Sequence, residues 1–126
     1  MTEPNYAHGK ICYLIIPARD PQESAAFFAA VFNWQIRSHD DGTVAFDDPV
    51  GGVSGVWLAG REPADNPGTE IHIMVSDADA VEQDIVTNGG SLVWRADAGT
   101  PEIFGTFRDP SGNLFGYYQQ AGLSGQ

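Results

Sequence analysis

Phe46-Asp-Asp-Pro-Val-Gly-Gly-Val-Ser-Gly-Val-Trp57 and Phe107-Arg-Asp-Pro-Ser-Gly-Asn-Leu-Phe-Gly-Tyr-Tyr118 share the pattern Phe-x-Asp-Pro-x-Gly-x-x-x-Gly-x-aromatic. The two stretches align without a gap at a constant offset of 61 residues. Asp-Pro-x-Gly alone is a common turn signal, which would explain one copy. It does not explain the phenylalanine, the second glycine and the aromatic residue that accompany the turn in both copies. The chain is therefore predicted to contain an internal repeat.

A second ungapped match extends the repeat toward the N-terminus and predicts one helix in each copy. At an offset of 57 residues, Asp20 aligns with Asp77 and Asn33 with Gly90. Each aspartate is a suitable N-cap, and the first is followed by Pro and, three residues after the cap, by Glu. Apolar residues then recur at helical spacing until Asn33 ends the first helix and the run 88–90, Asn-Gly-Gly, ends the second.

Strands surround each predicted helix. A continuous apolar run at residues 11–16 predicts a strand before the first helix, and residues 71–75 are the matching strand before the second. An Asp-Asp-Gly turn predicts a hairpin in the first copy. The other predicted strands are at 34–39, 43–46, 91–95, 103–107 and 114–119.

The predicted fold class is α+β, with two modules that each have the order βαβββ. The modules are expected at residues 10–60 and 69–121, joined by a linker at 61–68 that is rich in proline, glycine and polar residues. Each module alone would leave one sheet face uncovered, so the modules should pack together or onto another chain. A length of 126 residues favours a single domain, 1–126.

The charge, the apolar runs and the cysteine content of the chain exclude several classes of partner and location. Six Lys and Arg against 17 Asp and Glu give a formal net charge of −11, which argues against nucleic acid and anionic membranes. No apolar run reaches the roughly 20 residues that span a bilayer, and the first ten residues lack a leader pattern, so a cytoplasmic protein is expected. The one cysteine, Cys12, excludes an intramolecular disulfide and is interpreted as a buried apolar residue.

Several segments resemble the vicinal oxygen chelate superfamily, which includes glyoxalase I, fosfomycin-resistance enzymes, extradiol dioxygenases and bleomycin-binding proteins. Ile16-Pro-Ala-Arg-Asp-Pro21 and Ala26-Phe-Phe-Ala-Ala-Val-Phe-Asn-Trp34 look like its first strand and helix. Val75-Ser-Asp77 looks like the opening of its second module, and Arg108-Asp-Pro-Ser-Gly-Asn-Leu114 like its closing turn. The resemblance covers residues 11–119 and implies the glyoxalase/bleomycin-resistance/dioxygenase fold, in which the two modules form a cupped mixed sheet. This fold hosts several unrelated chemistries.

The resemblance also implies where a metal would be held. Metal-using members place ligands on the opening and closing strand of each module, and these positions fall on Tyr13, Gly55, Glu70 and Gly116. Only Glu70 is an ordinary ligand, whereas a protein-bound divalent ion needs roughly three or more. No metal and no other cofactor is therefore expected. A reduced site made of Glu70 and His72 remains open, because His72 lies two residues along the same strand.

Strand alternation predicts the lining of the cup. Cys12, Leu14 and Ile16 should lie beneath the helix, and Trp34 and Trp94 are interpreted as core residues. Glycine at positions 55 and 116 would widen the floor. The residues expected to face a ligand are Ile11, Tyr13, Ile15, Trp57, Glu70, His72, Met74, Leu114 and Tyr118.

Three functions are consistent with this lining. The leading hypothesis is a metal-independent protein that sequesters a cationic or aromatic small molecule, and the resemblance implies a homodimer. The alternative is a glyoxalase-like lyase or isomerase in which Glu70 and His72 act as acid and base. A partner protein that assembles through a sheet edge or helix is the third. Structural roles also stay open, because Glu70 could pair with an arginine or lie at a rim, and His72, Tyr13 and Tyr118 could be satisfied within the fold.

Overall fold

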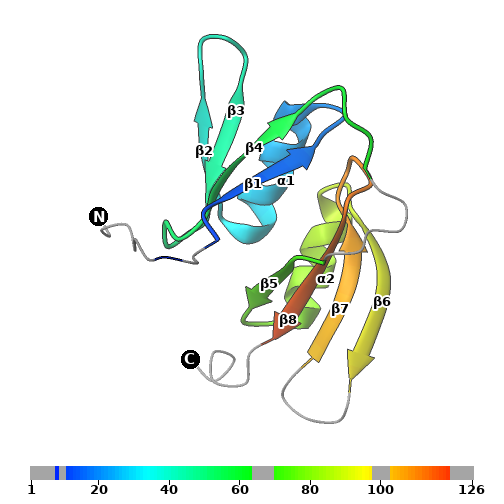
Figure 1. Cartoon of the computed structure of the whole chain (residues 1–126). Helices are drawn as coiled ribbons and strands as arrows, with labels where there is room; N and C mark the ends of the chain where they lie inside the picture. Colours follow the sequence, from blue (N-terminus) through cyan, green and yellow to red (C-terminus); the bar gives the residue numbers. More distant parts are fainter. Residues whose placement is uncertain (1–7, 9–10, 64–69, 98–102, 120–126) are drawn as a thin grey trace. The chain divides into compact units, whose positions relative to one another are not determined.

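The computed structural model describes residues 8, 11–63, 70–97 and 103–119, and the chain divides into two compact units, Met1–Glu62 and Pro63–Gln126. The division falls within the predicted linker, of which residues 64–68 lie outside the described part. Each unit is one four-stranded mixed sheet with one helix on one of its faces (Figure 1). We call the other face of each sheet, which the unit's own helix does not cover, its open face. That the whole chain is a single domain stays a prediction.

Unit 1 has the predicted βαβββ order. Its elements are β1 (Tyr13–Pro17), α1 (Pro21–Phe32), β2 (Gln35–Ser38), β3 (Val44–Asp47) and β4 (Ser54–Leu58). The strand order in the sheet is β1-β4-β3-β2, with β1 parallel to β4 and the other pairs antiparallel. The parallel pair exists because α1 and the β2–β3 hairpin lie between β1 and β4 in the chain, which gives room for a crossover.

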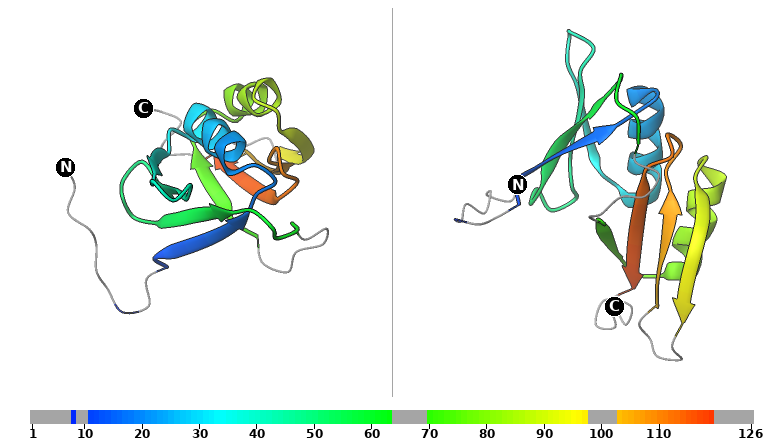
Figure 2. Two further views of the ribbon diagram at one scale, coloured as in Figure 1. Left: turned by 90° about the horizontal axis from the view of Figure 1, so that it is seen from above. Right: turned by 45° about the vertical axis from the view of Figure 1, so that its right-hand side comes forward.

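Unit 2 repeats this topology. Its elements are β5 (His72–Val75), α2 (Ala78–Thr87), β6 (Ser91–Asp97), β7 (Ile103–Arg108) and β8 (Leu114–Gln119). The order is β5-β8-β7-β6, and again only the first pair is parallel. Figure 2 shows α2 along one face of this sheet. The two mixed sheets and two helices confirm the predicted α+β class and the two βαβββ modules.

The helices begin and end where local chemistry predicts. The Asp20 carboxylate accepts a hydrogen bond from the backbone N–H of Gln22, and that of Asp77 accepts one from Ala80, both at 3.1 Å. Asn33 ends α1 in the left-handed conformation, at φ 62°. The Glu23 carboxylate, which the sequence places three residues after the cap as in a capping box, accepts a hydrogen bond from Arg19 at 2.6 Å.

The core of unit 1 is a cluster of aromatic rings between α1 and the sheet. The ring centroids of Phe28 and Trp34 are 4.4 Å apart, those of Trp34 and Phe46 are 4.5 Å apart, and those of Phe46 and Trp57 are 4.7 Å apart. All four side chains are buried. Trp34 is therefore a core residue, as predicted.

The core of unit 2 is smaller and lies between α2 and β7–β8. Ile85 of α2 is buried against the helix-facing side of the sheet, where the Phe107 and Phe115 rings stack at 5.8 Å. Tyr117 is also buried on this side. Within the described part of the chain, neither helix is long and apolar enough to cross a membrane.

Candidate functional site

The open face of unit 2 brings together five of the predicted site residues. Because side chains alternate along a strand, the burial of Phe115 and Tyr117 on the α2 side places Leu114 and Tyr118 of β8 on the open face. His72 and Met74 of β5 pair with Gly116 and Tyr118 and share that face. Glu70 lies two residues before the start of β5, and its carboxylate contacts the His72 ring on the open face.

Glu70 and His72 form a carboxylate–imidazole pair. The Nε2 atom of His72 lies 3.1 Å from an Oε1 atom of Glu70, and the side chains are 40% and 48% exposed, respectively. A carboxylate can only accept a hydrogen bond, so Nε2 donates and Nδ1 remains available as an acceptor. The carboxylate of this pair can hold a cation, and Nδ1 can accept a hydrogen bond from a ligand.

Gly116 makes room for this pair. A Cβ atom built on Gly116 would overlap the imidazole ring of His72, with Nδ1 the nearest atom. The ring therefore occupies the space of the missing side chain. The sequence analysis noted Gly116 only as a metal-ligand position that has no ligating side chain. The structure shows that this glycine also leaves the space in which the His72 ring lies.

Aromatic rings continue across the same face. Phe104 of β7 pairs with Tyr118, and the two rings stack at 6.1 Å with an interplanar angle of 17°. The Trp94 ring of β6 lies 5.8 Å from that of Phe104 and is 54% exposed. Met74, which is 61% exposed, lies beside Tyr118 at the other end of the row. We call the side chains of Met74, Trp94, Phe104 and Tyr118 the aromatic row.

Two members of the aromatic row were absent from the predicted site. Trp94 was interpreted as a core residue, which is wrong, because β6 is the last strand of its sheet and Trp94 points to the open face. Phe104 was not nominated. The signal was present, since the hairpin turn that pairs Arg108 with Leu114 also sets Phe104 opposite Tyr118.

The open face of unit 1 carries the other predicted positions. Tyr13 and Ile15 of β1 are 53% and 47% exposed there, and Ile11 before the strand is 70% exposed. Ile16 is buried on the α1 side as expected. Cys12, predicted to be buried, is exposed because it precedes the first paired residue of β1, an edge strand.

A polar network on this face was not predicted. The Arg37 guanidinium donates to both carboxylate oxygens of Asp47, at 2.9 and 3.2 Å, and the Ser54 hydroxyl donates to Asp47 at 2.5 Å. The hydrogen bond from Ser54, helped by that from Arg37, lowers the pKa of Asp47 against the opposing effect of burial. In the sheet, Ser54 is also the partner of Tyr13.

The expectation that Trp57 lines the cup is wrong. Trp57 is 1% exposed and its ring packs on Phe28 of α1 at a centroid distance of 5.8 Å. Gly55 lies on the same side, since a Cβ there would overlap the Phe46 ring. Neither residue is on the open face.

A turn that is longer by one residue explains the error. Asp48 hydrogen-bonds to the carbonyl of Val53, whereas the matching Asp109 hydrogen-bonds to that of Asn113, one residue sooner. The ungapped alignment therefore fails after the Asp-Pro-x-Gly turn, and a shift of one residue reverses the face of every following side chain. The position in unit 1 that corresponds to Gly116 is Val56, which pairs with Ile15 as Gly116 pairs with His72.

The positions that the resemblance implies for a metal do not form a conventional ion site in this chain. With the register corrected they are Tyr13, Val56, Glu70 and Gly116, of which Glu70 alone is an ordinary ligand. In the described residues, no three His, Cys, Asp or Glu side chains are grouped so that they could hold an ion.

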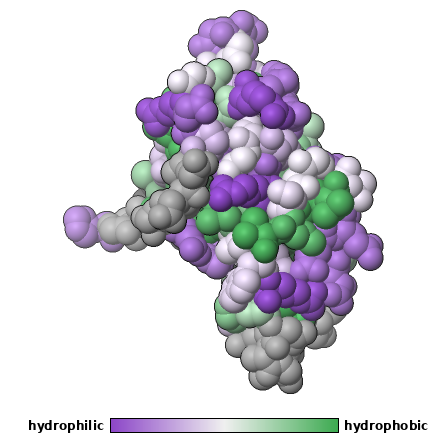
Figure 3. Space-filling view, turned by 90° about the vertical axis from the view of Figure 1, so that its right-hand side faces the viewer, coloured by the Kyte–Doolittle hydropathy of each residue, from purple (hydrophilic) through white to green (hydrophobic). Residues whose placement is uncertain are grey.

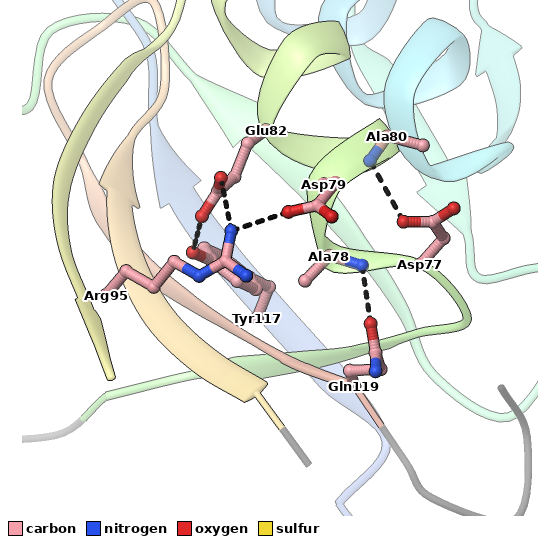
Figure 4. Close-up of polar contacts among 8 residues, drawn as sticks. All are labelled: Asp77, Ala78, Asp79, Ala80, Glu82, Arg95, Tyr117 and Gln119. Atoms are coloured by element: carbon pink, nitrogen blue, oxygen red, sulfur yellow. Dashed lines mark hydrogen bonds and ion pairs between the residues drawn. The ribbon is translucent and has the colours of Figure 1, made fainter. Parts of the chain in front are cut away.

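Beneath the open face of unit 2, a charged cluster fastens α2 to the sheet (Figure 4). Arg95 of β6 contacts Asp79 at 2.7 Å and Glu82 at 2.9 Å, and the buried Tyr117 hydroxyl donates to Glu82. Burial, together with Glu82, raises the pKa of Tyr117, and the hydrogen bond to Asp79 raises that of Arg95. The cluster lies on the side of the sheet opposite the open face and holds α2 against β6 and β8, the strands that carry Trp94 and Tyr118.

Comparison with known proteins agrees with this fold. The family model of the glyoxalase-like domain matches residues 13–117. A glyoxylase-like domain-containing protein from Didymella fabae is 28% identical over an alignment that covers 84% of this chain and 90% of that protein.

Solved structures resemble the chain over most of its length. The fosfomycin resistance protein FosX from Listeria monocytogenes has a TM-score of 0.74 at 15% identity, covering 90% of this chain and 93% of that one. A glyoxalase/bleomycin resistance protein/dioxygenase family enzyme from Burkholderia phytofirmans PsJN has a TM-score of 0.70 at 17% identity, covering 88% and 98%. At such identities the likeness shows the fold alone.

Proposed function

Since the chain belongs to the glyoxalase-like domain family, we propose that it binds a planar, cationic small molecule on the open face of unit 2, without a metal. One observation carries the proposal: the aromatic row and the Glu70–His72 pair share a single sheet face. Stacked rings offer flat apolar contact and a negative π-face, and a carboxylate at one end favours a positive group.

Two further points support this function. The formal net charge of −11 attracts cations to the whole molecule. Structural neighbours are named for resistance to fosfomycin and bleomycin, which are small molecules. The homodimer, the cytoplasmic location, and ligand contacts at Tyr13 and Ile15 stay predictions that rest on the sequence and its resemblance.

A matched pair of ligands tests the proposal. 9-Aminoacridine is a planar cation at neutral pH, and acridine is its neutral counterpart. Titration calorimetry should show that the cation binds more tightly. Because Trp34 and Trp57 are buried in unit 1 and Trp94 is 54% exposed, binding should also quench tryptophan fluorescence through Trp94.

Glu70→Gln separates the contribution of the Glu70 charge from that of stacking on the aromatic row. The glutamine keeps the size and the hydrogen-bond acceptor of Glu70 but removes its charge. Because the carboxylate is 48% exposed, we expect a loss of about 1 kcal/mol, or about fivefold in the Kd of 9-aminoacridine. The Kd of acridine should not change. An equal effect on both ligands, or no binding of either, would overturn the proposal.

The 3.1 Å contact between Glu70 and His72 favours a second candidate, proton transfer by a lyase or isomerase. Glu70 would orient the ring, and Nδ1 above Gly116 would be the base. In that case Glu70→Gln and His72→Ala should abolish turnover without lowering the unfolding temperature. Metal analysis after purification without chelator separates the metal-dependent version of this candidate from the metal-free one.

A further inference from the structure

A second exposed feature of unit 2 lies where α2 runs beside β6, away from the open face. Arg95 of β6 contacts Asp79 and Glu82, so this stripe of α2 lies along the strand. Val86 is one turn beyond Glu82 on the same stripe, and Leu92 is three residues before Arg95. The tight connection, in which the Gly90 N–H donates to the Ile85 carbonyl at 2.8 Å, brings these two ends together.

Three large apolar side chains are exposed at this place. Val86 is 56% exposed, Leu92 45% and Val93 53%. The pairing of β6 with β7 is irregular between Leu92 and Trp94, so Val93 has no partner residue across the ladder. Figure 3 views the side on which β6 lies in Figure 1 and shows hydrophobic residues gathered there with hydrophilic residues around them. We call Val86, Leu92 and Val93 the α2–β6 edge.

Unit 1 shows that the fold does not require such an edge. Its corresponding edge strand, β2, carries the exposed polar residues Gln35, Arg37 and Ser38. Among the described residues of α1 and β2, none is a large exposed hydrophobic residue. Polar and charged side chains are the usual protection of an edge strand, and β6 lacks them at residues 92–94. Two copies of one module thus differ at this surface.

The charges around the edge indicate which partner it fits. The helix α2 carries no lysine or arginine, and its carboxylates Asp79 and Glu82, on the same stripe as Val86, share Arg95, which leaves one negative charge in excess beside the edge. Another copy of this chain would bring the same negative charge, and an anionic membrane would be repelled by the formal net charge of −11. A partner with apolar and basic side chains complements both the exposed apolar residues of the edge and the negative charge beside it.

We propose that the α2–β6 edge binds a cationic, amphipathic segment of another protein. The inference is independent of the small-molecule function, because Val86, Leu92 and Val93 lie outside the proposed ligand contacts. Apolar side chains of the segment would cover the three exposed residues, and its lysines or arginines would face Asp79 and Glu82.

The test uses the whole chain and two fluorescein-labelled probe peptides. One is an amphipathic peptide of leucine and lysine, and the other has glutamate in place of every lysine. Fluorescence anisotropy should show binding of the lysine peptide only. Val86→Lys and Val93→Lys each remove apolar contact and add a like charge, and each should weaken binding at least about fivefold.

Val50→Lys is the matched control. Val50 is a 70% exposed valine of unit 1, so its substitution changes the net charge equally without touching the α2–β6 edge. Binding should be unchanged in this variant, and all three variants should unfold at the wild-type temperature. Equal binding of both peptides, or equal weakening by Val50→Lys, would overturn the proposal. A dimer of the free protein that Val93→Lys dissociates would overturn it in favour of a second copy.

Discussion

Two residues without side chains shape unit 2. A Cβ on Gly105 would overlap the ring and hydroxyl of Tyr117 on the helix-facing side, and one on Gly116 would overlap His72 on the open face. Tyr117 and His72 can therefore occupy their positions only because glycine stands beside each. Alternation along the strands predicted that His72 and Gly116 share a face, but not that their side chains exclude each other.

Gly116→Ala should displace His72 and break its contact with Glu70. We expect a loss of stability of about 1–3 kcal/mol from the overpacked methyl group, and weaker binding of 9-aminoacridine. In a His72→Ala background the methyl group meets no ring, so the same substitution should cost much less. Denaturant unfolding of the four variants of this double-mutant cycle measures the difference. Additive effects would show that His72 does not lie over Gly116.

Asp47 should give unit 1 a defined dependence on pH. Its pKa is lowered from 3.8 in the folded state, chiefly by the Ser54 hydroxyl, so its carboxylate stabilises the fold above pH 3.8 and loses this effect as the pH falls further. Asp47→Asn should lower the free energy of unfolding by about 1 kcal/mol at neutral pH. In acid the difference between variant and wild type should shrink. A difference that is constant between neutral pH and acid would contradict this role.

At the scale of elements, every predicted helix and strand is present, because each depends on local signals. The caps at Asp20 and Asp77, the left-handed Asn33 and the apolar runs act within a few residues of the chain. The face that a strand presents depends instead on the length of the preceding turn. For that reason the sequence pattern placed Trp57 on the open face, whereas the longer turn of residues 48–53 turns it into the core.

Deleting Val50 tests this explanation. The deletion makes the first Asp-Pro turn as long as the second, so β4 must either strain its turn or shift by one residue. A shift would take Trp57 out of the core, at a cost of about 3–5 kcal/mol. Urea unfolding should show a loss of this size or a loss of cooperativity. Val50→Ala keeps the turn length and should be near wild type, because Val50 is 70% exposed. Wild-type stability of the deletion variant would exclude the register explanation.

For the whole molecule, the internal repeat was sufficient to predict the fold class, because two similar halves with strand, helix and hairpin signals fit few architectures. The site was predicted in part. Residues on β5 and β8 followed from alternation, while Trp94 and Phe104 depend on pairing between strands that are distant in the sequence. The difference between the two edge strands, β2 and β6, could not be interpreted until their places at the ends of the sheets were known.

The claim on which this account depends is that a ligand stacks on the open face of unit 2. Amide and side-chain chemical shifts of the labelled protein, recorded by NMR while 9-aminoacridine is added, test it most directly. We predict that the largest changes occur at His72, Met74, Trp94, Phe104 and Tyr118, with smaller changes in α2 behind the sheet. Changes centred on α2 and the buried residues Phe107, Phe115 and Tyr117, with the open face unaffected, would contradict the claim.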